Sequence, residues 1–553
     1  MKEHYMPILR QVEENLKYFA ATQIKDENSF EHGGFLNYTD NLVHPGSATG
    51  SMLTLVPLYV NKDSKYFGDD KLYKVIIDAL NYIKRVQRPD GTFDLLTTNF
   101  YSSPDAGFIV QNLAHAYRIV EKYGFNEKCE KIKDDLYYII KKAGYGMVNG
   151  GFHTPNHRWV IAAALMMAYN ITEETPFKEM AKRYLNEGID CDENGEYTER
   201  SSGIYNAVND NALIILSEEM KREDLLLHVK RNLNMMLTYI EPDWSLFTQH
   251  STRQDKGEGS NATQAFYPIP YYHIYLYMAY KLNNKTYAYV ADHIFKNSIK
   301  WSKSLPNALY LFMLKEEFKE FDMEKEPISE NYHVYYENSG VVRVRNKDAT
   351  YTILKDSSNF FFFQKGSLKC RMKMCASFFA KAQFKAQEII KMPNGYKLSF
   401  KTQGHYWMPF EETPPTSDWR KMDHSKRKLV NILDLVFDVI IEESDEGINM
   451  RFAVKGCDRV PVKVEFCFSP YSMVQNENFA AMGEPGQSMV VKSGFVDVRN
   501  GIDTIKTGPA FGKHAYTTEM RGSEPQSKSD YTVYFTDYTN FERDIKINLF
   551  ESR

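Results

Sequence analysis

The sequence predicts two domains of different class. An α/α toroid, an incomplete barrel of helical hairpins, is expected over residues 1–325, and an antiparallel β-sandwich over residues 326–553. Apolar residues recur at helical spacing through the first part of the chain, and near residue 325 the recurrence changes to the alternation of β-strands. The length of 553 residues is also several times that of an ordinary domain.

Apolar stripes at intervals of three and four residues mark the expected helices. The clearest examples are residues 72–83, 108–120, 132–140, 160–169 and 225–240. The segment 160–169 (VIAAALMMAY) is apolar nearly all round, which is typical of an inner helix covered by an outer ring. Roughly a dozen such helices fit, and hairpins in a toroid suit this number better than a bundle of fewer, longer helices.

Alternating apolar residues and turn residues mark the expected strands of the second half. These segments are residues 332–346, 351–354, 396–400, 435–441, 462–468, 488–498 and 531–534. The charged stretch Lys315–Lys325 lacks the periodicity found on either side of it. We therefore expect the domain boundary there.

Composition excludes several classes of function. The chain is 25% charged with a net charge of −4, so wholesale nucleic-acid binding is not expected. Aromatic residues make up 14% of the chain, a surplus that is typical of large cores and of surfaces that hold sugar rings. The six cysteines have no metal-binding or redox spacing, so we expect neither a zinc ribbon nor a redox motif, and the sequence shows no convincing cluster of metal ligands.

The amino-terminal segment has the pattern of an amphipathic helix. Its apolar residues stand at helical spacing among charges, which is unlike the apolar run of a signal peptide: Met6, Leu9, Val12, Leu16 and Phe19. No stretch approaches the ~18 apolar residues of a membrane span. The sequence therefore predicts a cytoplasmic protein without a membrane partner, or a secreted one if a leader has been removed from the chain. It leaves open whether the chain is a monomer or a homodimer.

Two loops crowd polar and aromatic residues in front of apolar helices. Residues 150–159 form a glycine-rich loop that places Asn156 and His157 at a helix start. Asn156 could simply cap that helix. Residues 195–206 form the second loop, which has no obvious packing purpose and ends at Tyr205.

The two loops together carry a resemblance to a known family. The Asn156-His157 pair, followed by Tyr-x-Glu-Arg-Ser-x-x-x-Tyr from Tyr197 to Tyr205, resembles the helical-domain signature of the heparinase II/III and oligoalginate lyase group of polysaccharide lyases. Those enzymes join an α/α toroid to an antiparallel β-sandwich, in the order expected here. The resemblance implies β-elimination at a uronic acid in an acidic oligo- or polysaccharide, without an organic cofactor.

This chemistry assigns roles to four residues. A proton leaves the carbon next to a carboxylate, whose charge must be damped by hydrogen-bond donors. Asn156 and His157 are suitable donors. The resemblance gives Tyr205 the role of acid, or of acid and base together. Arg200 could supply a cation beside that tyrosine or bind a substrate carboxylate in fork geometry, and the sequence leaves both roles open.

Further loops supply candidate substrate contacts. Residues 249–255 carry His250 and Arg253, which could line the opposite wall of the cleft, although His250 could equally be bonded within its own loop. Asn99 and Asp105 belong to a loop of short polar side chains suited to sugar hydroxyls. The remaining expected contacts are Tyr197 and Glu199 of the second loop, and His405, Tyr406 and Trp407 of the sandwich.

Two other functions fit the same fold. An α/α toroid can also host a glycoside hydrolase with paired carboxylates, for which Asp90, Asp94, Asp105 and Asp210 are candidates. A non-catalytic glycan-binding protein could keep the cleft without the chemistry. Fold alone does not separate these functions.

Overall fold

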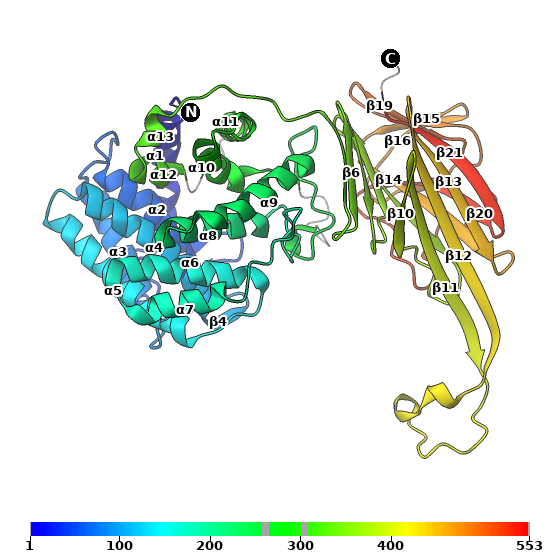
Figure 1. Cartoon of the computed structure of the whole chain (residues 1–553), viewed down its shortest axis with the longest axis horizontal. Coiled ribbons are helices and arrows are strands. Elements are labelled where there is room, and N and C mark those ends of the chain that lie inside the picture. The colour runs from blue at the N-terminus through cyan, green and yellow to red at the C-terminus, as the bar shows by residue number, and fades with distance from the viewer. Residues whose placement is uncertain (1, 257–264, 301–304, 306–307, 551–553) are drawn as a thin grey trace. The chain divides into compact units, whose positions relative to one another are not determined.

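A computed structural model describes residues 2–256, 265–300, 305 and 308–550, which form two compact units (Figure 1). The first unit is helical. Its helices are α1 (Tyr5–Thr22), α2 (Pro45–Val60), α3 (Asp70–Val86), α4 (Ser103–Tyr123), α5 (Glu127–Asn149), α6 (Pro155–Thr172), α7 (Thr175–Leu185), α8 (Tyr205–Met220), α9 (Leu226–Tyr239), α10 (Tyr272–Leu282), α11 (Lys285–Lys300), α12 (Ala308–Leu314) and α13 (Glu317–Glu320). Among the described helices, none is long and apolar enough to cross a lipid bilayer.

Every second helix belongs to an inner ring. Helix α2 packs against α4, α4 against α6, α6 against α8, α8 against α10, α10 against α12, and α12 against α2. Residues Trp159–Ala168 of α6 are all buried, as expected for an inner helix. Helix α4 approaches α6 closely at Gly107, where a Cβ atom would stand 3.2 Å from Val160 Cγ1.

Three inner helices begin near one another. The ring of Phe108, in the first turns of α4, lies 6.4 Å from that of His157 in the first turn of α6. Asn156, also in that turn, bonds to Glu199 in the loop that leads into α8. We call this end of the ring, where α4, α6 and α8 begin, the toroid mouth.

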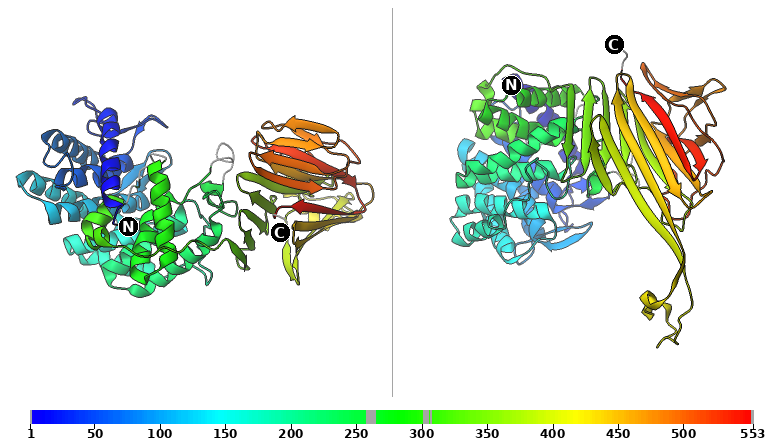
Figure 2. Two further views of the ribbon diagram at one scale, coloured as in Figure 1. Left: turned by 90° about the horizontal axis from the view of Figure 1, so that it is seen from above. Right: turned by 45° about the vertical axis from the view of Figure 1, so that its right-hand side comes forward.

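The second unit is a β-sandwich of two sheets (Figure 2). The nine-stranded sheet has the order β10-β11-β12-β13-β21-β19-β18-β15-β16, and the eight-stranded sheet the order β17-β20-β14-β9-β8-β7-β6-β5. The strands are β5 (Asn331–Tyr336), β6 (Val341–Asn346), β7 (Ala349–Leu354), β8 (Phe361–Lys365), β9 (Leu368–Ala376), β10 (Glu388–Met392), β11 (Gly395–Trp407), β12 (Leu429–Ser444), β13 (Gly447–Gly456), β14 (Pro461–Phe468), β15 (Met473–Asn476), β16 (Phe479–Met482), β17 (Ser488–Val490), β18 (Val496–Asn500), β19 (Asp503–Gly508), β20 (Tyr531–Tyr538) and β21 (Phe541–Asn548).

One hydrophobic core joins the two sheets. Phe437 and Val439 of β12 and Val464 and Phe466 of β14 are fully buried in it. Adjacent strands pair antiparallel, apart from the short β17, which runs parallel to β20. The structure thus confirms the predicted fold class, helices followed by an antiparallel sandwich.

A short segment between α9 and α10 belongs to the second unit and not to the helices that flank it. Residues Ile240–Ser245 pack with the strands. Glu241 accepts from the fully buried Arg343 at 2.9 Å and from the Thr350 hydroxyl at 2.7 Å. The ion pair accounts for this placement, because Arg343 would otherwise be a buried cation without a counter-charge.

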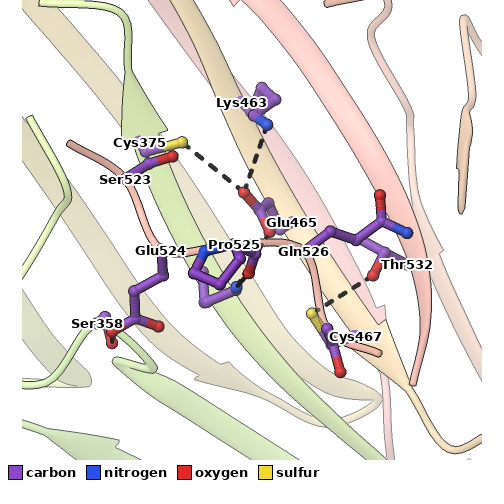
Figure 3. Close-up of polar contacts among 12 residues, drawn as sticks. Ser358, Cys375, Lys463, Glu465, Cys467, Ser523, Glu524, Pro525, Gln526 and Thr532 are labelled. Atoms are coloured by element: carbon purple, nitrogen blue, oxygen red, sulfur yellow. Dashed lines mark hydrogen bonds and ion pairs between the residues drawn. The ribbon is translucent and has the colours of Figure 1, made fainter. Parts of the chain in front are cut away.

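A second buried group of charges lies on the eight-stranded sheet (Figure 3). The Glu465 carboxylate is 3.4 Å from Lys373 Nζ and 3.8 Å from Lys463 Nζ, and each of the three residues is at most 4% exposed. The lysines also donate to the backbone carbonyls of Pro525 and Thr518, at 3.0 and 3.1 Å. The cluster therefore fastens the segment 518–525 to the sheet.

Replacing Glu465 with alanine is expected to lower the free energy of unfolding of the second unit by about 3–5 kcal/mol, because two buried ammonium groups lose their counter-charge. Urea denaturation followed by circular dichroism measures this change. Glu542 is the matched control, since it pairs with Arg451 on the same sandwich but is 50% exposed. Its alanine variant should leave the unfolding midpoint almost unchanged, and equal effects of the two substitutions would contradict the expectation.

Candidate active site

Three loops meet at the toroid mouth: residues 150–156, 196–204 and 248–256. The third loop is bonded to the second at two points. Thr252 donates from its backbone nitrogen and its hydroxyl to the Glu199 carbonyl, at 3.2 and 2.9 Å. Asp255 accepts from the Gly203 nitrogen at 2.8 Å. The loops are thus held together before any substrate arrives.

Glu199 connects the first of these loops to the third. Its carboxylate accepts from the backbone nitrogen of Asn156 at 3.2 Å and from the side-chain nitrogen at 2.7 Å. Arg253 Nε lies 3.3 Å from the other carboxylate oxygen. Glu199 is 3% exposed, and burial raises its pKa, against the opposing effects of Asn156 and Arg253. Glu199, which sequence analysis expected to contact the substrate, is therefore a buried group that orients Asn156 and Arg253.

Asn156 is fully buried in the first turn of α6. Its amide nitrogen donates to Glu199 and, at 3.2 Å, to the Thr154 hydroxyl. The amide oxygen has no hydrogen-bond partner among the described residues. The amide thus bonds across loops and to the N-cap residue Thr154, and the bond to Thr154 is the longer one.

His157 stands beside Asn156 and is 8% exposed. Burial lowers its pKa to about 4, with smaller contributions from His153 and Arg253. The imidazole is therefore uncharged at neutral pH. The ring centre of the exposed His153 lies 4.9 Å from that of His157, and the ring centre of Phe108 lies 6.4 Å from it. Sequence analysis assigned no role to either neighbour.

The His157 imidazole is expected to stay uncharged between pH 8 and about 5, because its pKa is about 4 and the ordinary value is 6.5. A nuclear magnetic resonance titration of the ring protons, assigned with His157→Gln, measures this. The unfolded chain protonates first, so this residue lowers the free energy of unfolding as the pH falls from 6.5 to about 4. A titration midpoint near 6.5 would contradict the buried environment.

Tyr205 is the first residue of α8 and is half-buried. Its backbone nitrogen donates to the Ser201 hydroxyl at 3.0 Å. The Arg253 guanidinium lies over the ring, 4.8 Å from its centre. Arg200, which stands before the helix, is half-buried and adopts a left-handed backbone with φ 51°. Arg253, from the third loop, thus places a cation over the Tyr205 ring.

Tyr197 and His250 lie farther inside the unit than sequence analysis expected. Tyr197 is fully buried and donates to Asp210 at 2.8 Å, and burial raises the pKa of both groups well above their ordinary values. His250 stacks on Tyr239 with ring centres 4.6 Å apart, and its Nε2 atom lies 3.3 Å from Glu196. Both side chains are bonded or stacked within the first unit, and their contact with a substrate stays a prediction.

Asn99 begins β4 (Asn99–Ser102), which pairs with β3 (Phe93–Leu95) in front of α4, and Asp105 lies in the first turn of α4. The Asn99 amide donates to Asp105 at 3.3 Å. Asp105 also receives the hydroxyl of Ser102, the N-cap residue of α4, so its carboxylate stabilises the helix start. These two residues lie in the first unit with the three loops.

His405, Tyr406 and Trp407 end strand β11 in the second unit. Tyr406 is 58% and Trp407 is 46% exposed. The constellation described above contains only residues of the first unit. Among the described residues of both units, no group of three or more His, Cys, Asp or Glu side chains is arranged to hold a metal ion.

Comparison with solved structures shows that the chain has the fold of polysaccharide lyases with an α/α toroid and a β-sandwich. It matches a xanthan lyase from Paenibacillus with a TM-score of 0.61 at 9% identity, over 99% of this chain and 57% of that one. It matches a chondroitin AC lyase from Streptomyces coelicolor A3 with a TM-score of 0.54 at 10% identity, over 100% of this chain and 80% of that one. For a heparinase III, the TM-score is 0.51 at 10% identity, over 98% and 92% of the two chains.

This chain thus spans little more than half of the xanthan lyase it matches. No protein-family model matches the sequence, and no characterised protein matches it in sequence.

Proposed function

We propose that the protein is a carbon–oxygen lyase that cleaves a uronate-containing glycan by β-elimination. The observation that supports this most directly is the arrangement at the toroid mouth. Glu199 holds Asn156 next to the uncharged His157, and Arg253 bridges from Glu199 to the ring of Tyr205. The matched enzymes are named for xanthan, chondroitin and heparin.

The proposed reaction assigns each group a task. Asn156 and His157 donate hydrogen bonds to the uronate carboxyl, where negative charge develops as the adjacent carbon loses its proton. For this, Asn156 gives up its longer bond, to Thr154. Tyr205 takes the proton from that carbon as the base and gives it to the glycosidic oxygen as the acid, while the carbon–oxygen bond breaks and a carbon–carbon double bond forms.

The hydrolase alternative finds no support in the carboxylates proposed for it. Each is held by neighbouring groups: Asp90 by Thr92, Asp94 by Arg88, Asp105 by Ser102 and Asn99, and Asp210 by Tyr197. Paired carboxylates for hydrolysis would have to flank a scissile bond.

A screen of acidic glycans for ultraviolet absorbance tests the proposal, because only elimination creates the unsaturated uronate. We expect absorbance to rise with at least one uronate polymer and not with the same polymer after reduction of its carboxyl groups. New reducing ends without absorbance would show a hydrolase. Retention of a glycan without any cleavage would show a binding protein.

A further inference from the structure

The strands β11 and β12 extend beyond the sandwich as a two-stranded arm (Figure 1). Strand β10 pairs with β11 only as far as Ser399, and β13 pairs with β12 only from Leu435 onward. Between these points the two strands pair with each other alone, up to Trp407 and Leu429. The loop 408–428 closes the arm, and we call residues 405–429 the arm tip.

The arm tip is ordered by its own aromatic and cationic side chains. The Arg427 guanidinium lies between the rings of Phe410 and Trp419, 3.9 and 5.2 Å from their centres. The His424 ring lies 4.2 Å from that of Trp419 and stacks at 5.3 Å on Trp407. A surface that is already ordered loses little conformational entropy on binding a ligand.

Large aromatic side chains remain exposed on this tip. Trp419 is 55% exposed, and Tyr406 and Trp407 are 58% and 46% exposed. Two of the five tryptophans of the chain thus stand half in solvent at one place. Exposed aromatic residues that lie together mark interaction sites.

Charges of both signs surround these rings, with one positive charge in excess. Four cationic side chains of the tip are exposed: Arg420, Lys421, Lys426 and Lys428. The four carboxylates Glu411, Glu412, Asp418 and Asp423 are exposed too, and Asp418 pairs with Lys421 at 3.4 Å. The tip thus carries a small positive excess, whereas the chain as a whole carries a net charge of −4.

We propose that the arm tip itself binds an acidic polysaccharide chain. Aromatic faces suit sugar rings, and the interspersed cations suit carboxylate or sulfate groups. A second copy of the chain is a poorer occupant, because the centres of protein interfaces are depleted of charged residues and charged side chains surround the rings here. The choice of a glycan rests on the proposed function.

The test measures glycan retention without turnover, by affinity electrophoresis in gels that contain polygalacturonate, alginate or chondroitin sulphate, with dextran as the neutral polymer. The chain with Trp407→Ala and Trp419→Ala should bind an acidic polymer about tenfold more weakly than the unaltered chain. The matched control is Tyr471→Ala, since Tyr471 is an aromatic of the same unit that is 68% exposed. The Tyr471→Ala variant should leave glycan retention unchanged.

A charge variant keeps the test independent of how the aromatic variant folds. Arg420→Gln with Lys421→Gln and Lys426→Gln leaves the rings in place and should weaken retention and its dependence on salt. Unchanged retention in both variants, or equal retention by dextran, would overturn the proposal. The proposal would also be overturned if light scattering showed that the tip variants change the chain from a dimer to a monomer while glycan retention stays the same.

Turnover separates this proposal from that of the toroid mouth. The tip variants should lower kcat/KM on an acidic polymer. Acidic retention that depends on the tip, in a chain that produces no unsaturated product, would overturn the lyase and leave the arm-tip site. Elimination by a chain whose glycan retention does not depend on the tip would overturn the arm-tip site and leave the lyase.

Discussion

Replacing Tyr205 with phenylalanine is expected to reduce the rate of elimination by about 10²- to 10⁴-fold, the range that general acid–base catalysis contributes. The substitution removes one oxygen and keeps the ring, so the contact with Arg253 at 4.8 Å is preserved. Binding of the glycan should change little. The measurement is the initial rate of absorbance increase, with affinity determined separately on the same polymer.

The position of Tyr205 explains why the effect should fall on proton transfer. The residue is half-buried at the start of α8, beside the loops that carry Asn156 and Arg253. Its backbone nitrogen is held by Ser201 and its ring lies under Arg253, and neither contact uses the hydroxyl. Loss of the hydroxyl therefore removes the transferable proton without releasing the loop.

Tyr197→Phe is the matched control from the same motif. Tyr197 is buried and donates to Asp210, so its loss should cost about 1–3 kcal/mol of stability, because a buried acceptor is left without its donor. The rate per folded molecule should stay near that of the unaltered chain. If Tyr197→Phe abolished elimination and Tyr205→Phe did not, the role assigned to Tyr205 would pass to Tyr197.

Periodicity predicted the fold because it reports local burial. The segment 160–169 is apolar all round, and α6 is an inner helix with Val160–Ala168 buried. Along strand β12, buried residues alternate with partly exposed ones, and the buried residues Leu435, Phe437, Val439 and Ile441 lie in the core. Such patterns need no knowledge of the partner element.

Contacts across loops could not be predicted in this way. Tyr197 and Tyr205 stand in one motif, yet one turns into the core and the other begins a helix, because only Tyr197 meets Asp210. Arg253 was expected on the opposite wall, whereas its pairing with Glu199 joins two loops. Glu241 follows α9 in sequence but pairs with Arg343 of the sandwich. These placements depend on tertiary partners that spacing does not encode.

Asn156→Ala is expected to lower turnover by about 10²- to 10³-fold, the cost of losing one donor to a developing negative charge. The loss should appear mainly in kcat, because the donor acts on charge that is greater in the transition state than in the bound substrate. His157→Ala should act in the same direction. Michaelis parameters on the polymer identified by the absorbance screen measure both changes.

The control for Asn156 comes from the other end of the same helix. Asn170 also donates its amide to a glutamate, Glu219, at 2.7 Å, but it is exposed in the last turns of α6. Asn170→Ala should leave kcat unchanged. The comparison separates the loss of an amide–carboxylate bond in general from the loss of this one.

Removing Asn156 also leaves Glu199 without one of its donors, so the rate could fall through displacement of Arg253 instead. Glu199→Gln distinguishes the two causes, because it keeps the size of the side chain and an oxygen for Asn156 while it removes the charge that pairs with Arg253. If Asn156 acts on the substrate, Asn156→Ala should be the more damaging change. Equal losses in the two variants would show that Asn156 works only by holding Glu199, and full activity or outright unfolding of both Asn156→Ala and His157→Ala would make the pair structural.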